Sequence, residues 1–161
     1  MKKLAVLFFF SFFISFTEAQ TTTSLDVSEE INEKIEKALN DMLSEGKDAM
    51  KIVSVTPIKN LIDGSIYEFS VIATYSLISK EQAILNIGFN NGSSEKSHRL
   101  ISDASKIINN GTSYHIFKVK AKVVDWSKIG GAFYVSTNMS EYPHERKWSP
   151  LASDRFFLKV D

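Results

Sequence analysis

The stretch Ile66–Leu77, "IYEFSVIATYSL", decides the fold class of this chain. Apolar and polar side chains alternate along it, which is typical of a β-strand because successive side chains point to opposite faces. The apolar positions are Tyr67, Phe69, Val71, Ala73, Tyr75 and Leu77. The pattern therefore predicts a strand with one buried face.

The same alternation continues along most of the chain after residue 49. In residues 113–126, "SYHIFKVKAKVVDW", apolar residues alternate with Lys118, Lys120 and Lys122, a lysine row typical of a solvated face or an edge strand. The pattern predicts seven strands, at about 50–58, 65–77, 82–89, 98–108, 114–125, 132–139 and 152–160. Turn-like stretches such as "NNG" and "KIGG" separate them, without intervening helices. We therefore expect a mainly β domain over residues 49–161, a seven-stranded antiparallel sandwich of two sheets.

In its strand order and its aromatic run "YEFSVIATY", this layout resembles the immunoglobulin-like and fibronectin type III-like modules of exported proteins, over roughly residues 50–161. The resemblance implies a β-sandwich whose end loops recognise a ligand. The Cys–Trp–Cys pattern of antibody domains is absent, since the chain contains no cysteine. A helix followed by antiparallel strands is also similar to the cystatin-like protease inhibitors, which implies a sheet wrapped around a helix. Their glutamine–valine–glycine hairpin has no match in "TPIKNLIDG", residues 56–64.

An amphipathic helix is expected before the strands, at 27–45 within a polar segment that covers residues 20–48. Its apolar positions recur at helical spacing and are Ile31, Ile35, Leu39, Met42 and Leu43. Asp26 and Glu29 have the spacing of a capping box, and Gly46 can end the helix. The apolar stripe would either pack on the β-domain or form a contact with a partner, such as a homodimer.

The first residues, "MKKLAVLFFFSFFISFTEAQ", have the build of a secretory signal peptide over residues 1–19, cleaved after Ala19. Their apolar core, Leu4–Phe16, would span about 20 Å as a helix, short of the roughly 30 Å of a bilayer core. We expect an exported chain, extracellular or periplasmic, without a transmembrane anchor. Removing Lys2, Lys3 and Glu18 leaves 17 basic and 18 acidic residues, so no nucleic-acid partner is expected.

The motifs of familiar enzymes are absent from the sequence, which has no phosphate-binding glycine loop, no G-x-S-x-G elbow and no calcium loop. "HERKW" begins like a metalloprotease box but has Trp148 in place of the second histidine. No metal or cofactor is therefore expected, and the chain is expected not to be an enzyme. A small hydrolase built around His115 or His144 remains an alternative, because catalytic triads are assembled in space.

The stretch "SEYPHERKWSP", residues 140–150, is the best candidate for a binding loop. It is expected to join the last two strands at one end of the sandwich, where scaffolds of this kind carry recognition loops. Tyr142, His144, Arg146 and Trp148 offer rings and donors for a protein or a glycan, and Trp126 is a further candidate for stacking on a sugar. Tyr142 and Trp148 could instead pack over the end of the core.

Three asparagines match the N-glycosylation pattern, which would apply in a eukaryotic source: Asn91, Asn110 and Asn138. The composition would also suit a bacterial exported protein. The sequence thus predicts an exported binding or adhesion module. The alternatives are a structural protein that oligomerises through the helix, a cystatin-like inhibitor and a small hydrolase.

Overall fold

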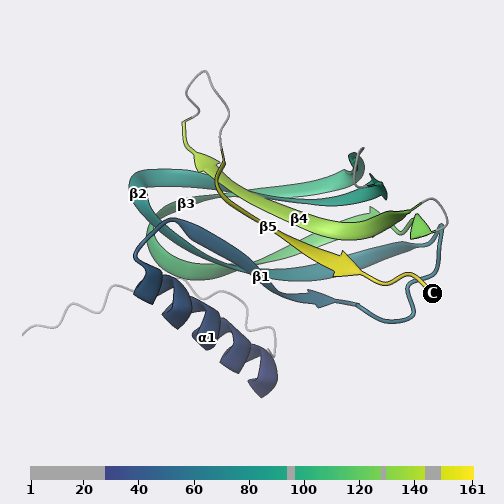
Figure 1. Cartoon of the computed structure of the whole chain (residues 1–161), viewed down its shortest axis with the longest axis horizontal. Helices are drawn as coiled ribbons and strands as arrows, with labels where there is room; N and C mark the ends of the chain where they lie inside the picture. The colour runs from purple at the N-terminus through teal and green to yellow at the C-terminus, as the bar shows by residue number, and fades with distance from the viewer. Residues whose placement is uncertain (1–27, 94–96, 128–129, 144–149) are drawn as a thin grey trace, which may run out of the picture.

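The chain forms one curled β-sheet with a helix on its outer side (Figure 1). The structure is a computed structural model that describes residues 28–93, 97–127, 130–143 and 150–161, except for the side chains of 91–103. The elements, in order, are α1 (Glu29–Glu45), β1 (Ala49–Thr56), β2 (Ile66–Ser93), β3 (Ser97–Lys122), β4 (Gly131–Glu141) and β5 (Pro150–Leu158). The predicted signal peptide lies outside the described residues.

The long strand β2 organises the sheet. Strand β3 pairs with one edge of β2 on both sides of its middle, while β1 and β4 follow one another along the other edge. Thus Val71 lies between Val55 and Phe117, whereas Leu85 lies between Met139 and Lys106. Strand β5 pairs with β4, and all these pairs are antiparallel. Both β2 and β3 bend midway, so the sheet folds over itself as a half-barrel (Figure 1).

The structure differs from the predicted seven-stranded sandwich, because its described residues form five strands in a single sheet. The stretches predicted at 65–77 and 82–89 are the two halves of β2, and those predicted at 98–108 and 114–125 fall mainly in the two halves of β3. Both predicted breaks lie at one bend, where the pairing passes from Leu77↔Gly111 to Gln82↔Asn109. Alternation is lost there, but pairing between the two strands resumes after the bend. The two layers that face each other across the core are therefore two halves of one sheet.

The core fills the inside of the curl, with side chains from the inner face of every strand. The core face predicted for residues 66–77 is confirmed, with Phe69, Val71, Ala73 and Leu77 fully buried. The prediction of a single buried face is wrong, because Ile72, Thr74 and Ser76 on the opposite face are buried as well. The rings of Phe69 and Phe89 lie 4.5 Å apart, and that of Phe133 lies 5.7 Å from Phe89. Aromatic side chains bury more apolar area than any others, so this cluster ties the two layers together.

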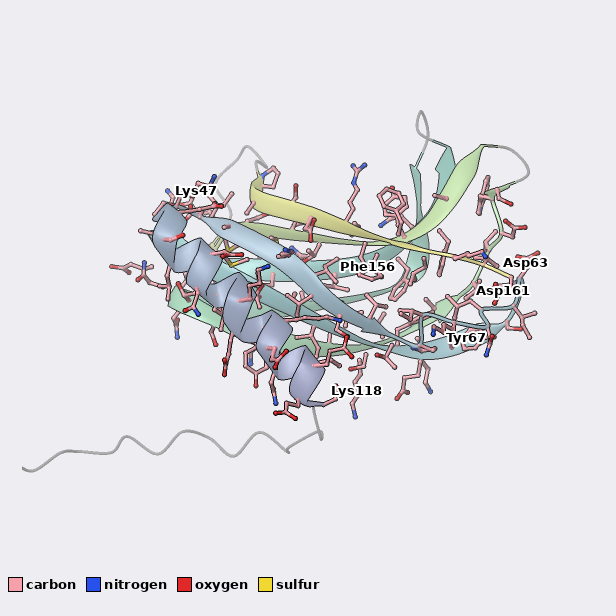
Figure 2. All side chains as sticks on the ribbon, turned by 60° about the horizontal axis from the view of Figure 1, so that its bottom comes forward. Lys47, Asp63, Tyr67, Lys118, Phe156 and Asp161 are labelled. Carbon is pink, nitrogen blue, oxygen red and sulfur yellow. The ribbon has the colours of Figure 1, made fainter. Side chains whose placement is uncertain are left out.

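Helix α1 packs on the outer face of the layer that contains β1 and the first half of β2, and it contacts β1, β2 and β3. Its buried residues Ile35, Ala38 and Met42 do not belong to the core cluster, which is formed by strand residues together with Leu61 and Val123. On β2 the buried outward residues Ile72 and Thr74 lie on this side. The sheet thus does not wrap around the helix as the cystatin-like alternative implies. Figure 2 shows the helix lying across the outside of the strands.

The helix differs in detail from its prediction. Ser28 occupies the N-cap position without a side-chain cap, and the predicted cap Asp26 lies outside the described residues. Gly46 ends the helix in the left-handed region, with φ 61°, as expected. Leu43 is 61% exposed, whereas Ala38 is buried. Most of the apolar stripe is therefore used within the chain, and a homodimer through the helix stays a prediction. Within the described residues, no helix is long and apolar enough to cross a membrane.

Candidate binding site at the bend of the sheet

The bend in β2 is held by Asp48, the residue before β1. Its Oδ1 accepts hydrogen bonds from the backbone N–H groups of Ile78 (2.7 Å) and Ser79 (3.0 Å), and the Ser79 hydroxyl donates to Oδ2. Burial acts to raise the pKa of Asp48, but these bonds and the charge of Lys80 outweigh it, so the pKa lies below its ordinary value. One carboxylate thus accepts hydrogen bonds from backbone N–H groups that, at the bend, do not pair with a neighbouring strand.

Asn110 on β3 holds the same bend from the other strand. Its side-chain Nδ2 donates to the carbonyl oxygens of Ile78 and Lys80, both at 3.1 Å. The next residue, Gly111, has φ 131°, a backbone conformation that side chains rarely adopt. The stretch "NNG" at residues 109–111, which resembles a turn in the sequence, is therefore part of a bend within the continuous strand β3.

A hollow of about 390 Å³ opens beside the bend, between β2 and the end of β4. It is lined by Ser79, Lys80, Glu81, Gln82, Glu141, Tyr142 and Pro143. The Lys80 ammonium and the Glu141 carboxylate form an ion pair across it, with Nζ and Oε1 2.8 Å apart. The backbone N–H of Tyr142 donates to the carbonyl oxygen of Gln82 at 3.3 Å, which fixes the start of the 140–150 stretch.

The groups in this hollow suit recognition. Tyr142 is 39% exposed, so its ring is open to a ligand. Around it are hydroxyl, carboxamide, ammonium and carboxylate groups, which can both donate and accept hydrogen bonds. An aromatic ring beside directional polar groups is typical of small recognition surfaces.

The structure brings together only part of the predicted site. Tyr142 lines the hollow, whereas His144, Arg146 and Trp148 lie outside the described residues. Trp126 is half-buried, and its carbonyl oxygen accepts a hydrogen bond from the N–H of Gly131, the first residue of β4. Tyr142 follows the last residue of the same strand, about 33 Å away along an extended path. Trp126 and Tyr142 therefore do not share one site.

Two of the three predicted glycosylation asparagines have described side chains. The amide of Asn110 is used at the bend, so a glycan on its nitrogen would compete with the bonds described above. Asn138 lies in the middle of β4, where its Oδ1 accepts a hydrogen bond from Asn86 Nδ2 at 3.2 Å. The side chain of Asn91 is outside the described set. Glycosylation at all three positions stays a prediction.

His115, a candidate for the hydrolase alternative, is half-buried with its ring edge-on to Phe117, at 4.6 Å between centroids. Burial lowers its pKa, and the charge of Lys106 lowers it further. A catalytic histidine is normally oriented by an acid, which would raise the pKa instead.

Among the described residues, no group of three or more histidines or carboxylates could hold a metal ion.

A second, smaller groove of about 260 Å³ runs between α1 and β1. Lys34, Lys37 and Lys51 line it together with Asp41. Lys34 is paired with Glu30 at 2.6 Å, which reduces the positive charge of this groove. It offers no aromatic side chain and is a weaker candidate than the hollow at the bend.

Comparison with known proteins finds no family model that matches the chain and no matching curated protein. The site must therefore be judged on its own geometry. Sequence reasoning missed Lys80, Gln82 and Glu141, which meet Tyr142 only through the pairing of β2 with β4. It also missed Asp48, although the loss of alternation at residues 78–81 marks the place that Asp48 holds.

Proposed function

We propose that the protein is an exported, non-catalytic binding or adhesion module that recognises a glycan or a protein through the 140–150 stretch. The observation that carries this proposal is the open hollow at the bend, with the exposed ring of Tyr142 beside the Lys80–Glu141 ion pair. Export rests on the signal-like first nineteen residues.

The rigidity of the hollow favours binding. Its β2 side is fixed by the bonds of Asp48 and Asn110, and its β4 side by the pairing of Ala83 with Glu141. A surface that is already ordered loses less conformational entropy when a ligand binds. Pro143 contributes to this, because its ring fixes the backbone directly after Tyr142.

The proposal is tested with the mature chain, residues 20–161, in a glycan-array screen and in a pull-down from secreted proteins. Tyr142→Ala is the test variant. Tyr114→Ala is its matched control, because Tyr114 is 43% exposed and Tyr142 39%, and Tyr114 lies on β3 away from the hollow.

We expect specific retention that is lost in Tyr142→Ala and kept in Tyr114→Ala, with both variants folded by circular dichroism. Equal retention by the two variants would mean that the ligand does not use the hollow. The absence of retention from both screens would remove the binding function itself.

A further inference from the structure

The outer face of β4 and β5 carries a row of polar side chains. Side chains alternate along these strands, so residues opposite the core face point outward. The pairing places Asn86, Asn138 and Ser153 side by side across β2, β4 and β5, with Ser136 and Arg155 in the next row. We call these five residues the outer polar face. Helix α1 packs against β1, β2 and β3, on the other layer of the curled sheet.

Hydrogen bonds hold three side chains of this face in place, those of Asn86, Asn138 and Ser136. Asn86 Nδ2 donates to Asn138 Oδ1 at 3.2 Å, which leaves the Asn138 amide N–H groups without a partner among the described residues. The Ser136 hydroxyl donates to the carbonyl oxygen of Gly88 at 3.3 Å and accepts from Asn90 Nδ2. The face therefore presents oriented amide and hydroxyl groups without having to order them on binding.

An exposed aromatic ring lies at one end of the outer polar face. Phe157 is 63% exposed, and its ring packs against Tyr134 with 5.4 Å between centroids. The guanidinium of Arg155 lies 5.5 Å from the centroid of the Tyr134 ring. A large apolar ring at the surface of a strand is available for stacking, and its support by Tyr134 fixes its position.

We propose that the outer polar face binds an extended, neutral oligosaccharide, with Phe157 as a stacking platform and Asn138 as a hydrogen-bond donor. This inference rests on the proposed function and extends it from the hollow at Tyr142 along β4. The six steps along the strand from Ser140 to Tyr134 give a path of about 20 Å. A sugar chain presents hydroxyl groups and apolar C–H faces, which match the amides and the ring.

Other occupants fit this face less well. A peptide that adds a strand would pair with the free edge of β5, the last strand of the sheet order, and would not lie on the side chains of this face. Sheets of two copies pack through apolar faces, whereas this one is mainly polar. Nucleic acid needs several cations along its phosphates, and Arg155 is the only charged residue among the outward-pointing residues of β4 and β5 that the structure describes.

The test is titration of the ¹⁵N-labelled mature chain with neutral hexasaccharides, namely cellohexaose, xylohexaose, chitohexaose and mannohexaose. We expect one of them to shift the side-chain amide signals of Asn138 and Asn86. Phe157→Ala should weaken that binding roughly tenfold, as expected for the loss of one aromatic contact. Ile66→Ala is the matched control, because Ile66 is 72% exposed at the start of β2, paired with Lys122 of β3.

The outcomes separate this inference from the proposed function. Binding that Phe157→Ala and Ile66→Ala affect equally would overturn the oligosaccharide site on the outer polar face. Binding lost in Tyr142→Ala but unchanged in Phe157→Ala would keep the hollow and also overturn it. If none of the four hexasaccharides binds at millimolar concentration, the inference is wrong, while the pull-down from secreted proteins still tests the hollow.

Discussion

Asp48 should be the residue on which the bend of the sheet depends most. Its carboxylate accepts two backbone N–H groups, from Ile78 and Ser79, and the Ser79 hydroxyl. A hydrogen bond to a charged group contributes about 1.5–3 kcal/mol when it is shielded from water. Here Ile78 is 50% exposed and Ser79 is also exposed, so water can replace much of each bond. Counting about 0.7 kcal/mol per bond, Asp48→Ala should lower the free energy of unfolding by about 2 kcal/mol.

Urea unfolding, followed by tryptophan fluorescence, measures this change. With a slope of about 2 kcal/mol per M, Asp48→Ala should shift the midpoint down by about 1 M. Asp48→Asn keeps one carbonyl oxygen for the two N–H groups and should lose about half as much. Asp41→Ala is the control, because Asp41 is an exposed residue of α1 whose carboxylate makes no hydrogen bond or ion pair with another described residue.

The pH dependence adds a second check. The pKa of Asp48 is lower in the folded chain than its ordinary value, so the charge stabilises the fold above about pH 4. That contribution is lost as pH falls through the folded pKa. The difference between the wild type and Asp48→Asn should therefore shrink below about pH 4. If Asp48→Ala and Asp41→Ala unfolded at the same urea concentration at pH 7, the role assigned to Asp48 would be refuted.

Three further predictions concern the bend, the seam between β1 and β5, and the half-buried histidine. Asn110→Ala should lower the free energy of unfolding by about 1–2 kcal/mol, because it removes two hydrogen bonds across the bend; an unchanged urea midpoint would contradict this. Asp154→Ala should cost about 1–2 kcal/mol and speed amide exchange at Ile52, whose N–H donates to the Asp154 carboxylate at 2.8 Å; slow exchange in the variant would argue against that role. The lowered pKa of His115 means that the unfolded chain binds its proton first, so stability should fall as pH drops below about 6.5; a His115→Phe variant with the same pH profile would show that another group is responsible.

The sequence was sufficient where the structure depends on local periodicity. Alternation between residues 66 and 77 correctly identified the face that points into the core, because the two faces of a strand are set by neighbours two residues apart. It did not reveal that Ile72, Thr74 and Ser76 on the opposite face are also buried. The number of strands was wrong because the bend depends on distant residues. Asp48 reaches Ile78 over 30 positions, and Asn110 reaches it over 32. The alternation simply stops at residues 78–81, which is also what a loop between two strands would produce.

The candidate site shows the same limit. Tyr142 could be selected from the sequence because aromatic residues in loops are typical of recognition surfaces. Its neighbours Lys80 and Gln82 could not, since they meet it only through the register that pairs Ala83 with Glu141. Trp126 was a candidate on chemistry alone, and only the strand order shows that it lies at the other end of β4.

The two proposed surfaces depend on the bend in different ways, which provides a way to separate them. The hollow is built from Lys80 and Gln82, directly at the segment that Asp48 and Asn110 hold. The outer polar face is built from regular cross-strand pairs, such as Asn86 with Asn138, away from the bend. An Asp48→Asn variant that remains folded should therefore weaken the binding of a ligand at Tyr142, while the position of the Asn138 side-chain amide should stay unchanged. A ligand that spans both surfaces should lose only part of its affinity, because the contacts along β4 would remain.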